Sequence, residues 1–180
     1  MLIPAGDECF SITGDLTIAE TNLTHVEGLR HLISIGGDLR IRFNSALTSL
    51  DGLSGLTSMG DLFIHANHAL KNLDGLSSLT SVEWGLQLYS NSVLTDISGL
   101  SSLTTVGGDL SITWSGGLTT LDGLSSLTSV GGDLTVLGNP ALTTLEGLSN
   151  LTTVGNLTVP TVGAGVPLDQ CRLNRFSHSV

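Results

Sequence analysis

Apolar residues recur along this chain in a fixed order, and the whole order repeats every 23 or 24 residues. Each copy opens with a phrase in which apolar and outward-facing residues alternate, as in Leu110-Ser111-Ile112-Thr113. Alternation with a period of two predicts a β-strand with one face buried. A period this regular predicts one structural unit stacked on copies of itself. The first Leu of each phrase is found at Leu16, Leu39, Leu62, Leu86, Leu110, Leu134 and Leu157.

Further apolar residues follow the strand phrase at a spacing of about three. A single turn cannot bury these side chains alone, so stability must come from the neighbouring turns. We expect backbone hydrogen bonds to run from turn to turn, as in a parallel sheet. Gly and β-branched residues are frequent and no long stripe with a 3.6-residue period appears, so helical segments are not expected. In the copy at 109–132 the inward positions are Leu110, Ile112, Leu118, Leu121, Leu124, Leu127 and Val130.

The repeat predicts an all-β fold: a right-handed parallel β-helix of about seven leucine-rich turns, each of 23–24 residues. The solenoid is expected over residues 13–165, with an N-terminal cap over 1–12 and a short C-terminal cap over 166–180. Caps are needed because the cut end of a solenoid exposes unpaired strand edges, and a weak cap would allow end-to-end self-association. A flatter α/β leucine-rich horseshoe is the alternative fold, disfavoured by the lack of a helical pattern in any repeat.

Polar residues occupy the corners between the apolar positions, again in columns. Gly pairs such as Gly107-Gly108 and Gly131-Gly132 are expected to supply positive backbone angles. The Asp after each pair is expected to bind corner N–H groups. An Asn column is interpreted as structural, because its amides can bond to the turn backbone and to the next Asn. These columns are Asp15, Asp38, Asp61, Asp109 and Asp133, and Asn44, Asn67, Asn91 and Asn139, with Ser115 in the gap.

The repeat can be written L-x-x-L-x-G-L-x-x-L-x-x-V-G-G-D-L-x-I-x-x-N. This leucine-rich-repeat-like motif most resembles the repeat of the receptor L domain, the β-helical ligand-binding domain of insulin-type and epidermal-growth-factor-type receptors. Over roughly residues 9–177 the chain is also similar to bacterial exported proteins with many such turns, which often end in a Pro followed by a Cys-containing tail, as at 167–171. The resemblance implies ligand binding and an extracellular or cell-surface location. It implies no receptor signalling, because a Cys-rich module is missing, and the corner Glu83-Trp84-Gly85 departs from the pattern.

The outward positions of the strand phrase differ from copy to copy, and they hold most of the chain's few aromatics and two of its six cations. Exposed clusters of aromatic and Arg side chains are typical of binding hot spots. They favour a non-catalytic scaffold that binds a protein or glycan partner. The simpler interpretation is that exposed strand positions favour aromatic and long side chains. The candidate ligand-binding residues are Arg40, Arg42, Phe43, Phe63, His65, Tyr89 and Trp114.

Two Thr columns favour a competing class of function, a structural or ice-adsorbing surface array. Regular Thr arrays on flat solenoid faces can order water. The strict Thr-x-Thr alternation of such faces is missing here, however, and Thr is also a small residue that strands tolerate. The columns are Thr24, Thr48, Thr95, Thr119 and Thr143, and Thr57, Thr80, Thr104, Thr128 and Thr152.

The net charge and the absence of known motifs exclude several other classes of function. A net charge of -10 disfavours nucleic-acid binding, and no apolar run is long enough for membrane insertion. No phosphate loop, nucleophile elbow or metalloprotease motif appears, so neither an enzyme nor a cofactor is expected. His65 and His68 have no recognisable third metal ligand. The Asp column and a second acidic column could both attract calcium, but each corner offers only one carboxylate, so no metal site is expected. The second column is Glu27, Asp51, Asp74, Asp122 and Glu146.

The two cysteines and the first residues complete the sequence-based expectations. Cys9 occupies the slot of Leu32 and is expected to be a small core residue, and Cys171 is expected in the C-terminal cap. Seven turns at about 4.8 Å each would separate the two sulfurs by about 30 Å, so no disulfide is expected. Met1-Leu2-Ile3-Pro4 lacks the basic start and long apolar stretch of a signal peptide.

Overall fold

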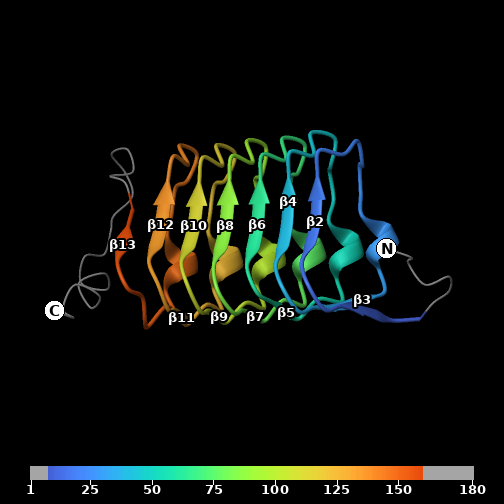
Figure 1. Ribbon diagram of the computed structural model, residues 1–180. Coiled ribbons are helices and arrows are strands. Elements are labelled where there is room, and N and C mark those ends of the chain that lie inside the picture. Colours follow the sequence, from blue (N-terminus) through green and yellow to red (C-terminus); the bar gives the residue numbers. More distant parts are fainter. Residues whose placement is uncertain (1–7, 160–180) are drawn as a thin grey trace.

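The computed structural model describes residues 8–159, which form a stack of parallel strands (Figure 1). The main sheet has seven strands, one from each copy of the strand phrase, and they lie side by side in chain order. This confirms the expected parallel β-solenoid. The strands are β2 (Leu16–Ala19), β4 (Leu39–Arg42), β6 (Leu62–His65), β8 (Leu86–Tyr89), β10 (Leu110–Thr113), β12 (Leu134–Leu137) and β13 (Leu157–Thr158).

Equivalent residues of successive copies pair with each other across the main sheet. Leu86 pairs with Leu62 on one side and with Leu110 on the other. Because this register continues through the sheet, a column read from the sequence is also a physical row of neighbouring side chains. The inward rows become the core, and the outward rows become one continuous face.

Short strands form two further sheets on another side of the stack. The four-stranded sheet contains β5 (Ser58–Met59), β7 (Ser81–Val82), β9 (Thr105–Val106) and β11 (Ser129–Val130). The strands β1 (Phe10–Ile12) and β3 (Leu32–Ile35) pair in parallel, and β3 contacts β5. The expected N-terminal cap at 1–12 thus includes a paired strand, while its residues 1–7 lie outside the described residues. The expected C-terminal cap at 166–180 lies wholly outside them.

The expectation that the repeats contain no helical segments is confirmed for α-helices in the described part of the chain, although short 3₁₀ turns were not foreseen. Within residues 8–159 there is no α-helix, but six copies contain a single 3₁₀ turn, and these turns stack behind the main sheet (Figure 1). Three residues are too few to leave a 3.6-residue stripe in the sequence. The turns are η1 (Glu27–Leu29), η2 (Asp51–Leu53), η3 (Asp74–Leu76), η4 (Ser98–Leu100), η5 (Asp122–Leu124) and η6 (Glu146–Leu148).

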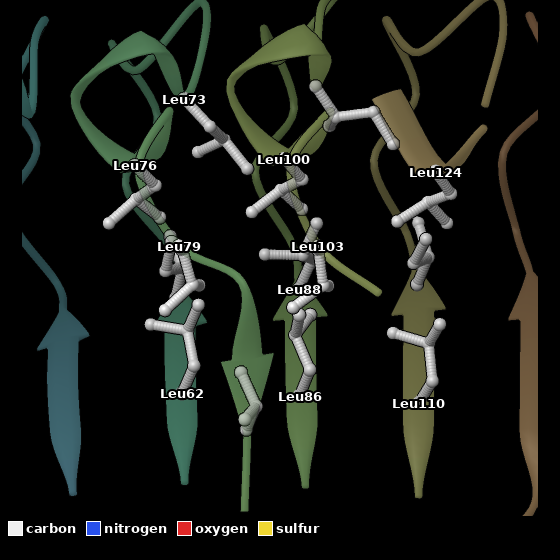
Figure 2. Packing of buried hydrophobic residues seen from close by; sticks show 14 of the residues in the cluster. Leu62, Leu73, Leu76, Leu79, Leu86, Leu88, Leu100, Leu103, Leu110 and Leu124 are labelled. Carbon is white, nitrogen blue, oxygen red and sulfur yellow. The ribbon is translucent and has the colours of Figure 1, made fainter. Parts of the chain in front are cut away.

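The core consists of aliphatic rows that run along the stack. All seven inward positions of the copy at 109–132 have 0% exposure, and Figure 2 shows Leu62, Leu86 and Leu110 in one such row. Each buried Leu, Ile or Val contributes roughly 1.5–3 kcal/mol, so these rows dominate the stability. The first turn departs from the pattern: Leu23 is 48% exposed, and Cys9, expected in the core, is exposed. Among the described residues this turn has a neighbouring turn on one side only.

The corner glycines do not have the positive φ that their sequence predicts. They are needed for space, since a Cβ added at Gly107 would lie 2.0 Å from the carbonyl oxygen of Glu83 in the preceding turn. Positive φ occurs instead at the residue that follows each strand of four and precedes the Asn column. The described residues with positive φ are Glu20, Phe43, Ala66, Ser90, Trp114 and Gly138.

The Asp and Asn columns have the structural roles expected of them. The Asp38 carboxylate accepts from the N–H of Asp61 at 2.8 Å, and the same link joins Asp109 to Asp133 at 2.8 Å. Buried Asn67 donates to the carbonyl oxygen of Ile41 at 2.9 Å. Side chains therefore tie each corner to the neighbouring turn, and the outward sheet positions remain free for other contacts.

Candidate functional site

The outward side chains of β4, β6 and β8 line a shallow, open depression with a volume of about 320 Å³. Two rows of the parallel register build it. The first row places Arg40 beside Phe63 and Phe63 beside Gln87, and the second row places Arg42 beside His65 and His65 beside Tyr89. We call this depression the sheet-face groove; its lining residues are Arg40, Arg42, Phe63, His65, Gln87 and Tyr89.

Arg40 is held in place by carboxylates of its own protein. Its guanidinium group forms an ion pair with Asp15 at 2.6 Å and a second, shorter one with Asp38. The N–H of Asp38 and the Arg40 side chain together hold the pKa of Asp15 below its ordinary value. The Arg40 guanidinium carbon also lies 5.6 Å from the centre of the Phe63 ring, within the range of a cation–π contact. The positive charge of Arg40 is therefore balanced within the protein.

Arg42 is different, although it is only two residues away. Its side chain is exposed, and it forms no ion pair with any residue in the range 8–159. Across the sheet it pairs with Ala19 on one side and His65 on the other. The groove therefore presents one cation whose charge is available to a ligand.

His65 lies between two aromatic rings. Its imidazole centre is 4.9 Å from that of Phe43 and 4.7 Å from that of Tyr89, the latter in an edge-to-face arrangement. Burial, together with the positive charges of Arg42 and His68, lowers the pKa of His65. The imidazole is therefore neutral at neutral pH, with one nitrogen able to donate and the other to accept. The three rings form a continuous, partly exposed aromatic ridge.

Phe43 and Trp114 adopt a backbone conformation that favours glycine, with φ of 57° and 58°. Such a conformation costs about 1–3 kcal/mol for a residue with a side chain, and the equivalent position in a later turn is Gly138. Exposed aromatic rings therefore occupy two positions where backbone geometry alone would favour the smallest residue.

Trp114 does not join the groove. A Cβ added at Gly138 would lie 2.9 Å from Cδ2 of Trp114, so the indole lies against Gly138 in the following turn. Its side chain is 60% exposed, whereas the adjacent Thr113, expected to face outward, is only 8% exposed. Five of the seven candidate residues thus line the groove, Phe43 adjoins it through His65, and Trp114 stands apart.

Gln87 and Trp84 are not among the candidate ligand-binding residues expected from the sequence. Gln87 lines the groove, and its place in the same outward row as Arg40 and Phe63 was the signal for it. Trp84 is 58% exposed just before β8, where it replaces a corner Gly. The departure of this corner from the repeat pattern was the signal for Trp84. Both positions are recognisable only when the copies are aligned by register.

Most hydroxyls of the two Thr columns donate a hydrogen bond to the preceding turn. Thr48 donates to the carbonyl oxygen of Thr24 at 2.9 Å, and Thr104 donates to that of Thr80 at 3.0 Å. The same bond recurs at Thr128 and Thr152. These hydroxyls reinforce the contacts between turns, and their protons are not free for solvent or ligand.

The groove offers binding chemistry: a free cation, a neutral imidazole, a phenol, an amide and two ring surfaces. Residues 8–159 contain no group of three or more His, Cys, Asp or Glu side chains placed to hold a metal ion. No helix in the same range is long and apolar enough to cross a membrane. No protein-family model matches the chain, and no curated protein matches it significantly. Fold and surface together define a repetitive parallel β-solenoid with an open groove on its main sheet.

Proposed function

We propose that this protein is a non-catalytic repeat scaffold that binds a protein or glycan partner through the sheet-face groove. In this proposal the solenoid is right-handed and has about seven turns. Seven parallel strands form the main sheet, and connections between parallel strands of one sheet are right-handed in about 98% of cases. Neither a cofactor nor nucleic acid has a part in it.

One observation carries the proposal: cations and aromatic rings gather on three adjacent strands, whereas the outward positions of the other strands hold mostly small residues. In the row of Phe63, the following turns carry Gln87, Ser111 and Thr135. The backbone pairing is the same in every turn, so folding does not require large side chains at β4, β6 and β8. Tyr and Arg are enriched in binding hot spots, which supports recognition as their role.

A groove variant tests the proposal. Arg42→Thr, Phe63→Ser and Tyr89→Thr introduce residue types that other turns carry in the same rows, so the fold should persist. Arg40 is kept, because its removal would leave Asp15 and Asp38 without their cation. A matched control on the same sheet combines Thr135→Ser with Leu137→Thr.

Binding would be measured on a glycan array and by affinity capture of proteins, with the wild type, the groove variant and the control in parallel. We expect a partner retained by the wild type and the control and lost by the groove variant, with melting temperatures that differ little. Retention of every partner by the groove variant would contradict the proposal, as would a loss of binding that merely follows unfolding.

The alternative is a structural or ice-adsorbing array built from the Thr and Ser columns. The inter-turn hydrogen bonds of the Thr hydroxyls favour a role in stability, because each such hydroxyl has already used its single proton within the protein. Thermal hysteresis in solutions of the wild type, lost on Thr104→Val and Thr128→Val substitution, would favour this alternative over the groove.

A further inference from the structure

The two Arg residues of the groove differ in how their charge is balanced. The whole chain carries a net charge of -10, so an anionic ligand is repelled by most of the surface. Arg40 is compensated by Asp15 and Asp38. Arg42 is exposed and has no ion pair among the described residues, so it places one cation in the groove that no carboxylate contacts.

From this arrangement we infer that the sheet-face groove binds a carboxylated sugar unit of an acidic oligosaccharide. The Arg42 guanidinium pairs with the sugar carboxylate, and the ridge of Phe43, His65 and Tyr89 packs against the sugar ring. This inference rests on the proposed function and deepens it by naming the chemistry of the partner.

The side chain of Arg42 is the reason for expecting a carboxylate in the ligand. A guanidinium group is a planar fork of donors that matches a carboxylate with two parallel hydrogen bonds. Because Arg42 forms no such pair within the described part of the chain, the pair is free to form with a ligand. Cations are scarce in the described part of the chain. It contains four Lys and Arg residues, and two of them, Arg40 and Arg42, lie in the groove.

A sugar fits the other groups of the groove. Gln87 and the hydroxyl of Tyr89 can both donate and accept, and neutral His65 can do the same, which suits ligand hydroxyl groups. The rings of Phe43 and Tyr89 are partly exposed and offer apolar surface beside these polar atoms. Polar and apolar groups thus alternate over a short distance, as they do around a pyranose.

The size of the groove favours a saccharide over a protein surface. Its volume of about 320 Å³ lies at the lower end of the roughly 300–1,000 Å³ typical of small-ligand sites. Three strands span only about 10 Å between the outer two, whereas a stable protein interface buries about 800 Å² on each partner. The row of Phe63 continues into Ser111 and Thr135, which provide no large apolar anchor for a protein. A chain of sugars could instead run along the solenoid axis over these small residues.

Calorimetric titration against a defined panel tests the inference. The panel contains trimers of galacturonate, a hyaluronan hexasaccharide and a trimer of sialic acid, each beside its carboxyl-reduced counterpart. An octapeptide of Asp and Glu is added as the acidic peptide arm. We expect at least one acidic oligosaccharide to bind with a Kd below about 1 mM, and more weakly at high salt.

Variants connect that binding to the groove. Arg42→Gln should weaken it about tenfold or more, as carboxyl reduction should, because both remove the same charge-assisted pair. Arg42→Lys should keep part of the affinity, and Lys71→Gln removes one charge elsewhere and should change nothing. Circular-dichroism melts check that each variant is folded.

Three results would overturn the inference: no acidic oligosaccharide binds at millimolar concentration, the carboxyl-reduced forms bind equally well, or only the acidic peptide binds through Arg42. Failure of the proposed function looks different. In that case the groove variant retains every partner that the wild type binds. If instead a neutral glycan or a protein is lost by the groove variant but not by Arg42→Gln, the groove remains the binding surface and only the carboxylated sugar is wrong.

Discussion

The side-chain oxygen of Asn67 accepts two hydrogen bonds from Asn44 in the preceding turn, one from its backbone N–H and one from its side-chain amide, each at 3.2 Å. The amide nitrogen of Asn67 donates to the carbonyl oxygens of Ile41 and His65. Asn67 is fully buried, so one side chain satisfies polar groups of two turns in a place that water does not reach.

Replacing Asn67 by Leu should therefore be strongly destabilising. The substitution removes an acceptor and two donors and leaves several buried backbone groups without partners, at about 1–3 kcal/mol for each. We expect a loss of about 3 kcal/mol or more in the free energy of unfolding, measured by chemical denaturation. Asn22→Leu, at an exposed position of the first turn, is the control and should stay within about 0.5 kcal/mol of the wild type. Equal effects at both positions would show that the Asn column has no special role.

Ser115→Asn should have the opposite effect. Ser115 fills the gap in the Asn column, and its buried hydroxyl oxygen has no hydrogen-bond partner among the described residues. In the neighbouring turns, Asn91 donates to the carbonyl oxygen of Ile64 at 2.8 Å and Asn139 donates to that of Ile112 at 2.9 Å. An Asn at position 115 would complete the series, and we expect a gain of about 1 kcal/mol and a higher melting temperature. Ser101→Asn on the surface provides the comparison, and a lower melting temperature for the buried variant would refute the prediction.

The 3₁₀ turns provide a matched pair of Gly substitutions. A Cβ at Gly75 would lie 1.9 Å from the carbonyl oxygen of Leu50 in the preceding turn, whereas a Cβ at Gly28 would meet nothing within 4 Å. Both residues hold the same place in the repeat. Gly75→Ala should force the turns apart and cost about 3 kcal/mol, while Gly28→Ala should be nearly neutral. Thermal melts of the two variants decide this, and a stable Gly75→Ala variant would contradict the close approach of the turns.

The stability of the protein should fall as the pH drops below about 6.5, because His65 has a lowered pKa. The unfolded chain binds a proton at the ordinary pKa of 6.5, before the folded protein does. Protonation therefore favours unfolding between 6.5 and the lowered folded value, and the contribution of neutral His65 is fully present only above 6.5. The groups that face His65 are Arg42 on β4, His68 beyond β6 and Tyr89 on β8.

His65→Phe separates this effect from the titration of other groups. Phe keeps a ring between Phe43 and Tyr89 but has no proton to bind. Melting temperatures would be measured from pH 7.5 to pH 5.0 for both proteins. We expect a steeper decrease in the wild type, and parallel curves would show that His65 is not responsible.

The repeat made the strands, their parallel register and the aliphatic rows predictable, because each is a direct consequence of residue spacing. The roles of Asp38 and Asn67 were predictable too, since a polar side chain at a corner has few partners other than the next turn. The 3₁₀ turns were not predictable from periodicity, which needs more than three residues. The corner at Gly107 was interpreted through backbone angles, although close contact between turns is what excludes a side chain there.

The candidate site was predictable as a set of outward positions but not as a geometry. Sequence could place Arg40 and Arg42 on the same face, but only the structure shows that carboxylates pair with Arg40 alone. One of its two partners, Asp15, is 25 residues away in the chain. The direction of the Trp114 indole was likewise hidden, because it depends on the space above Gly138 in the next turn.

The parallel register gives the face of the main sheet a modular character. Thr113 and Leu137 occupy the same row as His65 and Tyr89. A few aromatic substitutions on β10 and β12 could therefore create a similar ridge farther along the solenoid axis. Tandem duplication of one coil would lengthen the platform without requiring a new interior. Evolution or a protein engineer could therefore change the number and spacing of contact points while the leucine interior stays as it is.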